Sequence, residues 1–234
     1  MARALLVRGM LAGLLAGVLA TVFAYLAGEP SVDTAIGLEH DHGEELVSRG
    51  VQSTLGLFTG VAVYGIAIGG LLAIAFAFVY GRIGTLGPRV TAALLTGSAY
   101  VVVMLVPFLK YPANPPSVGK SGTIGSRTEL YFGFVALSIL FGLVAAYAGR
   151  KLADRFGAWT GGLLGCGGYL VAVGLAAWLM PIVNEVPADF PADTLWTFRI
   201  ASLGTQLTLW MVLGLTFGAL SEKVFSSRST AAAS

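Results

Sequence analysis

Both histidines of the chain, His40 and His42, lie in the segment EHDHGEE at residues 39–45, where they are surrounded by carboxylates. Neutral imidazole and carboxylate together suit borderline divalent ions such as Co²⁺, Ni²⁺ and Zn²⁺. Residues two apart share one side of an extended segment, and a glycine at position 43 lets the chain turn back. The segment therefore predicts a low-affinity metal collector with the ligands Glu39, His40, Asp41, His42, Glu44 and Glu45. A charged loop that is only solvated is the alternative.

The amino-acid composition indicates the class of protein that carries this segment. The chain has 234 residues, of which 56% are hydrophobic and 11% are charged. A soluble domain carries about 25% charged residues, so these charges are too few to cover a water-exposed surface, and a membrane protein is indicated. The net charge is only +2, and no basic stripe with interleaved aromatic residues is present, which excludes nucleic acid as a partner.

Six apolar stretches are long enough to span a bilayer, since a spanning helix needs about 20 mostly apolar residues. They lie at residues 5–27, 55–80, 90–109, 130–149, 160–181 and 200–221. The first also has features of a signal peptide, but glycines at four-residue spacing, which give a smooth helix face, favour a packed membrane helix. We expect an all-α, polytopic protein with a single transmembrane domain over residues 1–222 and a disordered cytoplasmic tail at 223–234.

The basic residues set the orientation, because cytoplasmic loops carry an excess of Lys and Arg. With a cytoplasmic N-terminus, the inner ones are Arg3, Arg8, Arg82, Arg89, Arg150, Lys151, Arg155, Lys223 and Arg228, and the outer ones are Arg49, Lys110, Lys120, Arg127 and Arg199. The inner majority predicts that both termini are cytoplasmic and that the loops 28–54, 110–129 and 182–199 lie outside. Most carboxylates then face outward and should attract cations, although outer loops also look acidic simply because they avoid basic residues.

An internal repeat is suggested by TAALLTGSAY (91–100) and TGGLLGCGGY (160–169), which share Thr, Leu-Leu and Tyr in register. Each follows a Gly-Arg pair and leads to a proline-rich outer loop, after which an arginine opens the returning helix. This pattern predicts three parallel helical hairpins, with a site at the repeat interface as in many transporters. Chance similarity between apolar segments is the alternative.

The outer loop segment LVPFLKYPANPPSVGKSG (105–122) contains four prolines, which fix φ and remove amide donors. Irregular backbone at membrane depth is tolerated only where it is buried in protein or lines a water-filled cavity. The segment is therefore interpreted as a pore mouth or plug, with a rigid surface loop as the alternative. NEVPADFPAD (184–193) is its expected counterpart, with Asn184 and Glu185 as oxygen donors.

No ionisable residue lies near the middle of any predicted span, which argues against proton antiport. Gln206, with Thr205 and Ser202, is the most polar intramembrane patch, although a buried amide equally serves to join helices. Neither a Walker motif nor a Ser/His/Asp set is present. We therefore expect no enzyme activity and no organic cofactor.

Several blocks along the chain carry a family resemblance: GEPSVDTAI (28–36), SRGVQSTLGLFTGVAVYG (48–65), VPFLKYPANPPSVG (106–119), SRTELY (126–131) and NEVPADFPADTLWTFRIASLGTQL (184–207). Through them the chain resembles, over nearly its whole length, the CbtA family of predicted cobalt transporter subunits. The resemblance implies Co²⁺ as transported substrate, with Ni²⁺ and Zn²⁺ as alternatives, in a bacterial cytoplasmic membrane and in connection with cobalamin supply. It also implies a small partner, CbtB, with one membrane span and its own histidines.

The polar positions within these blocks lie mostly at or beyond the outer membrane edge. We expect a mouth or pathway that is formed by Glu29, Asp33, Lys110, Asn114, Asn184, Glu185 and Asp193, with Gln206 deeper. Arg49, Arg127 and Arg199 are expected to form a structural network with carboxylates, because ions at this depth need partners. The expected partners are Glu29, Glu185 and Asp193.

The leading hypothesis is therefore uptake of Co²⁺ through a transporter of which this chain is one subunit. One alternative is a membrane assembly or metal-binding component that is not itself the conduit. A second is an integral membrane enzyme acting on a lipid or isoprenoid phosphate, with the three arginines binding the phosphate. The sequence carries no signal for a homo-oligomer.

Overall fold

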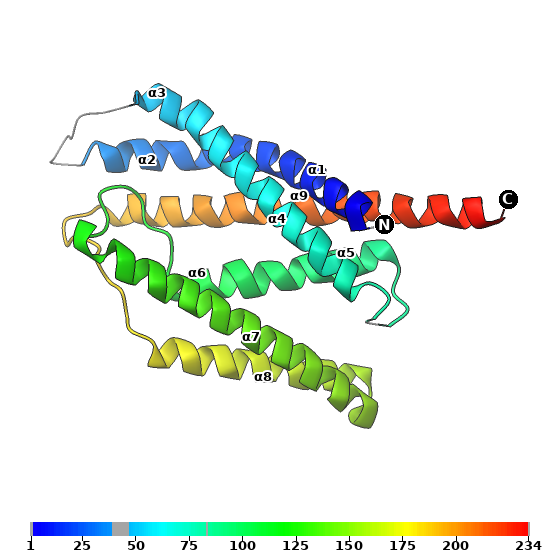
Figure 1. Ribbon diagram of the computed structural model, residues 1–234. Helices are drawn as coiled ribbons and strands as arrows, with labels where there is room; N and C mark the ends of the chain where they lie inside the picture. Colours follow the sequence, from blue (N-terminus) through cyan, green and yellow to red (C-terminus); the bar gives the residue numbers. More distant parts are fainter. Residues whose placement is uncertain (1, 39–46, 83, 234) are drawn as a thin grey trace. The chain divides into compact units, whose positions relative to one another are not determined.

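Every regular element in the described part of the chain is helical in the computed structural model (Figure 1). The structure describes residues 2–38, 47–82 and 84–233. Within them, 6 helices are long and apolar enough to cross a membrane: Ala2–Ile36, Arg49–Val79, Pro88–Lys110, Ile124–Phe156, Ala158–Leu179 and Ala192–Phe225. The all-α fold with six membrane-spanning helices is thereby confirmed.

The chain divides into two compact units, and each is described by itself. The first comprises residues 1–100, 115–117 and 191–234, and the second comprises residues 101–114 and 118–190. The first unit contains α1 (Ala2–Phe23), α2 (Glu29–Ile36), α3 (Arg49–Val51), α4 (Leu57–Val79), α5 (Pro88–Ala99) and α9 (Ala192–Ala233). The second contains α6 (Val106–Lys110), α7 (Ile124–Phe156) and α8 (Ala158–Leu179).

Within the first unit, α1 packs closely along α4 through glycine (Figure 1). A Cβ atom added at Gly13 would overlap the carbonyl oxygen of Gly65, and one added at Gly9 would overlap that of Gly69. Lipid tails are as apolar as leucine, so helices in a bilayer associate by close packing of small residues rather than by hydrophobic burial. The four-residue glycine spacing in α1 thus allows the two backbones to touch.

Helix α9 completes the first unit by packing against α1 and α5. Its buried face includes Leu213 and Phe217, and the ring of Phe217 meets that of Phe76 from α4 edge-on at 5.2 Å. At the end that is predicted to be cytoplasmic, a guanidinium nitrogen of Arg8 donates a hydrogen bond of 2.9 Å to the carbonyl oxygen of Leu220. This bond joins α1 and α9 at the edge of the apolar core.

The second unit is built on the hairpin of α7 and α8, which are joined through Gly157 at φ +84°. Such a positive φ is strained for residues with a side chain. Gly149 of α7 lies against Gly161 and Gly165 of α8, and the buried hydroxyls of Ser138 and Tyr169 lie 2.8 Å apart. As in the first unit, small residues and an interhelical hydrogen bond therefore join these helices within the membrane-spanning segments.

Several helices extend into the segments that were expected to be outer loops. Helix α2 runs to Ile36, α3 begins at Arg49, α7 begins at Ile124 and α9 begins at Ala192, so much of each expected outer loop is helical. Hydropathy identifies only the part of a helix that crosses hydrocarbon and not its polar continuation. Helix α9 also continues to Ala233 through the expected disordered tail, where alanine favours helix.

The division into units does not follow the expected hairpin repeat. It places α9 with α1 and α4, and it places α7 with α8. The repeat would instead pair the third span with the fourth and the fifth with the sixth. The three-hairpin repeat and the single transmembrane domain therefore stay predictions.

We predict that Gly13→Ala destabilises the protein by about 1–3 kcal/mol, because the new methyl group forces the backbones of α1 and α4 apart. Thermal unfolding of the purified protein in detergent measures the change.

Gly60→Ala is the matched control, because a Cβ at Gly60 in α4 would meet nothing within 4 Å. Alanine is the better helix former, so this control should be neutral or slightly stabilising. Equal stability of the two variants would contradict the close approach at Gly13.

Candidate functional site

At the end of the first unit that is predicted to lie outside, one arginine is bound by two carboxylates, and we name these residues the Arg49 cluster. Arg49 forms an ion pair with Glu29, and its Nε donates a hydrogen bond of 2.9 Å to Oδ1 of Asp33. The Glu29 side chain is 12% exposed, whereas that of Asp33 is 61% exposed. One positive charge faces two negative charges, so the cluster has a net charge of −1, and its more exposed carboxylate faces water.

The local sequence explains how the Arg49 cluster forms. Glu29 and Asp33 are four residues apart on α2 and therefore share one helix face. Arg49 begins α3 and returns the chain to that face. The expected metal collector at residues 39–45 lies outside the described residues, between α2 and α3 in the chain.

At the end of the second unit that is predicted to lie outside, hydrogen bonds join the two proline-rich segments. Nζ of Lys110 donates a hydrogen bond of 3.0 Å to the carbonyl oxygen of Met180, and the hydroxyl of Tyr111 donates one of 2.9 Å to that of Pro181. The backbone amide of Lys120 donates a hydrogen bond of 2.9 Å to Oε2 of Glu185. These bonds connect the segment around Lys110–Lys120 with the segment that follows α8.

Glu185 is contacted by Lys120, Thr123 and Arg127, and we name these four residues the Glu185 cluster. The Nε atom of Arg127 lies 3.4 Å from Oε2 of Glu185. The Thr123 hydroxyl hydrogen bond, followed by the Lys120 amide and the charge of Arg127, lowers the pKa of Glu185. Each of these groups stabilises the ionised carboxylate, so Glu185 remains charged and the positive charge of Arg127 is neutralised.

The remaining expected mouth residues differ in exposure. Asn114 is half-buried, whereas Asn184 and Asp193 are exposed. Arg199 is half-buried on α9, six residues after Asp193. The expected roles of these four residues stay predictions.

A cavity of about 290 Å³ lies within the first unit between α5 and α9. Its lining residues are Ala93, Thr96, Gly97, Tyr100, Leu207, Trp210, Met211, Gly214 and Leu215. Nε1 of Trp210, a residue that is only 4% exposed, has no hydrogen-bond partner, and neither has the buried Oε1 of Gln206 one helical turn earlier. A water molecule can accept a hydrogen bond from the Trp210 donor and donate one to the Gln206 acceptor, so the two groups together could bind water.

Sequence reasoning identified Gln206 but missed Trp210, because an indole in an apolar helix normally indicates packing. Its position one turn after Gln206 was the available signal.

Three π-helical segments interrupt the spanning helices and were also missed. They are Ala24–Gly28, Gln52–Gly56 and Tyr100–Leu105. Proline has no amide hydrogen, so Pro30 and Pro107 leave the carbonyls of Leu26 and Val103 without their usual helical donors. Both carbonyls lie in a π-helical segment, where the hydrogen-bond spacing has changed. The two prolines were therefore a readable signal for two of the three segments.

The described residues contain no group of three or more His, Cys, Asp and Glu side chains that could hold a metal ion. Glu29, Asp33 and Glu185 are instead paired with arginines in the two clusters described above.

Comparison with known proteins gives one match. The model of a family described as probable cobalt transporter subunit (CbtA) matches residues 2–222. No curated protein and no solved structure shows significant similarity to the chain.

We predict that Glu185→Gln weakens the second unit at neutral pH and makes its stability less dependent on pH. A carboxylate with a lowered pKa stabilises the fold above its ordinary value of 4.5, and this contribution is lost as the pH falls through the lower folded value. The wild type should therefore lose stability on acidification below about pH 4.5, and the variant should lose less. Melting temperatures from pH 7 to pH 3 measure the difference.

Asp189→Asn is the control, because Asp189 is an exposed carboxylate in the same outer segment. It should retain the pH profile of the wild type. A Glu185→Gln profile parallel to that of the wild type would show that the cluster does not stabilise the charged carboxylate.

Proposed function

This chain belongs to the family of probable cobalt transporter subunits, and from that premise we propose that it takes up Co²⁺ across the cytoplasmic membrane as one subunit of a transporter. The observation that supports the cation as cargo is the pairing of outer arginines with carboxylates. Arg49 meets Glu29 and Asp33, and Arg127 meets Glu185. Unpaired, these arginines would repel a divalent cation.

Capture is the first step of the proposal. The collector at residues 39–45 is acidic and carries both histidines, and it is attached directly to the two helices that hold the Arg49 cluster. A surface of one charge sign raises the local concentration of oppositely charged ions and their rate of association. We propose that the collector concentrates Co²⁺, and that the exposed carboxylate of Asp33 receives the hydrated ion.

The polar atoms of Gln206 and Trp210 support the deeper part of the route. They can hold water inside an apolar helix pair, and a hydrated cation needs such groups where no charged ligand is present. The membrane potential can drive this step, since it contributes about 2.3 kcal/mol per charge at 100 mV, or about 4.6 kcal/mol for a divalent ion. No covalent or enzymatic step is required.

The word subunit in the family's description implies partner proteins. We propose a small CbtB-like partner with one membrane span and its own histidines, which can supply imidazole ligands that this chain carries only at His40 and His42. The second candidate function, assembly of a transporter whose conduit lies in a partner, is favoured by the scattered placement of the described carboxylates.

We predict Co²⁺ influx into proteoliposomes that contain the chain together with its partner, at a rate that increases when the interior is made negative. Quenching of an encapsulated metal-sensitive dye measures the influx, and liposomes with the chain alone and with the partner alone are run in parallel. Influx with the partner alone would assign the conduit to the partner. No influx in any preparation would refute transport.

We further predict different defects for two sets of substitutions. His40→Ala with His42→Ala should raise the half-saturating Co²⁺ concentration by roughly tenfold with an unchanged maximal rate, because only capture is lost. Gln206→Leu should instead lower the maximal rate by about tenfold, which corresponds to the loss of one buried polar contact. Initial influx rates over a range of Co²⁺ concentrations separate the two effects.

Two controls match these variants. Glu129→Gln removes an exposed outer charge far along the chain from the collector, and Ile200→Ala shortens an exposed side chain of α9 outside the cavity. Both should behave as the wild type. Normal influx in every collector and Gln206 variant would favour the assembly function over the conduit.

A further inference from the structure

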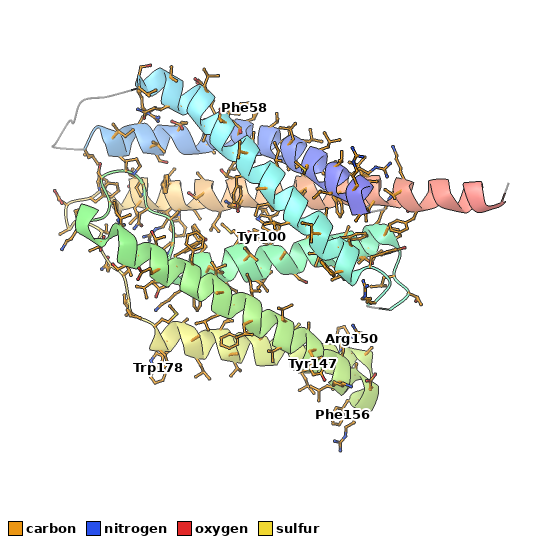
Figure 2. The ribbon with its side chains drawn as sticks, viewed as in Figure 1. Phe58, Tyr100, Tyr147, Arg150, Phe156 and Trp178 are labelled. Carbon is orange, nitrogen blue, oxygen red and sulfur yellow. The ribbon has the colours of Figure 1, made fainter. Side chains whose placement is uncertain are left out.

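The end of α7 that is predicted to be cytoplasmic carries an exposed basic face that the transport proposal does not use. Arg150, Lys151 and Arg155 are all exposed there, and Tyr147 is 67% exposed one turn earlier. Tyr147, Arg150 and Phe156 lie at this end of α7, next to the turn into α8 (Figure 2). We name Tyr147, Arg150, Lys151 and Arg155 the α7 basic face.

Helical geometry places these four side chains on one side of α7. At about 100° per residue, they span roughly 140° of the helix circumference. Gly149, which is buried against α8, lies on the opposite side. The basic face therefore points away from the α7–α8 contact.

Aromatic rings hold the cations in place at this end. Nζ of Lys151 lies 6.0 Å from the centre of the Tyr147 ring, and Cζ of Arg155 lies 5.3 Å from the centre of the Phe156 ring. Lysine and arginine close to aromatic residues are typical of the membrane–water interface, where the rings lie at headgroup level. Trp159, at the start of α8, is 81% exposed and extends this belt.

One carboxylate, Asp154, shares the basic face. No ion pair joins it to Arg150, Lys151 or Arg155 in the described part of the chain, so the three cations are not neutralised as Arg49 and Arg127 are. The face retains a net charge of +2, counting three cations and one carboxylate. Because of this positive charge, the α7 basic face is electrostatically complementary to an anion.

From this placement we propose that the α7 basic face binds the headgroup of an anionic phospholipid in the cytoplasmic leaflet. The phosphate accepts hydrogen bonds from Lys151 and Arg155, which are neighbours four residues apart, and Arg150 contacts the headgroup from the adjoining row. The acyl chains lie along the exposed apolar surface of α7, which includes Leu140, Leu143 and Val144. The site selects anionic over zwitterionic lipid and fixes the depth of the second unit.

Trp159 is a built-in reporter for this site. Trp178→Phe, Trp196→Phe and Trp210→Phe leave it as the single tryptophan of the full chain. The protein is reconstituted in bilayers of equal parts phosphatidylglycerol and phosphatidylcholine, with brominated chains on one lipid at a time. We expect brominated phosphatidylglycerol to quench Trp159 at least fivefold more effectively, since one basic residue near the surface changes lipid affinity by about fivefold.

Charge variants of the same reporter protein test the assignment. Arg150→Gln, Lys151→Gln and Arg155→Gln together should bring the quenching ratio to about one, and each single change should give an intermediate ratio. Arg3→Gln, Arg82→Gln and Lys223→Gln remove the same charge elsewhere on the predicted inner side and should leave the ratio unchanged. Asp154→Asn should raise the quenching ratio, because it removes the one negative charge on the α7 basic face. If the basic residues only set the orientation of the protein in the membrane, this substitution would not change the ratio.

Three results would overturn the proposal. The first is equal quenching by the two lipids in the unsubstituted face. The second is a quenching ratio that is unchanged by the triple substitution or by any one of the three single substitutions. The third is loss of the ratio on addition of inorganic phosphate, which would identify a site for free phosphate rather than for lipid. Because purified protein is used, Co²⁺ influx is not part of the readout, and failure of the transport proposal would be observed separately.

Discussion

Hydrocarbon provides no hydrogen-bond partner for a peptide group, and most features of this structure follow from that constraint. All the described spans are helices, because a helix satisfies its backbone internally. Where Pro30 and Pro107 remove a donor, the helix changes locally to π spacing and does not open to lipid. Two buried side-chain atoms, Oε1 of Gln206 and Nε1 of Trp210, are exceptions without a partner in the described part of the chain, and Trp210 lines the cavity between α5 and α9.

The same constraint decides how helices recognise one another. Between apolar helices in lipid there is little hydrophobic driving force, so close backbone approach and shared hydrogen bonds must hold the units together. Glycines provide the approach between α1 and α4 and between α7 and α8, and Ser138 with Tyr169 provides a buried polar contact in the second unit. Large side chains such as Leu71 and Phe78 of α4 are thereby left exposed for contact with lipid.

Ion pairs occur at both ends of the helices, as Arg89 with Glu222 at the expected inner end shows, but among the described residues the α7 basic face is not part of one. At the expected outer ends, Arg49 and Arg127 are paired with carboxylates, and the Arg49 cluster retains a negative charge. At the expected inner end of α7, the cations of Arg150, Lys151 and Arg155 are exposed without such partners. In the orientation that the sequence predicts, the negative Arg49 cluster would face cations outside, and the α7 basic face would face the anionic lipid of the cytoplasmic leaflet.

The sequence by itself determined the number of spans, the positions of the charged residues at their ends and the family, because hydropathy and motifs are local properties of the chain. It also indicated that arginines at the outer edge need carboxylates, since an ion at that depth is costly without a partner. Only the tertiary structure decided that Asp33 joins Glu29 on Arg49, that the amide of Lys120 donates to Glu185, and that α9 packs on α1 and α5. Apolar helices are nearly interchangeable in hydropathy, and their partners are selected by the fit of small residues and by helix rotation, which depend on residues far apart in the chain.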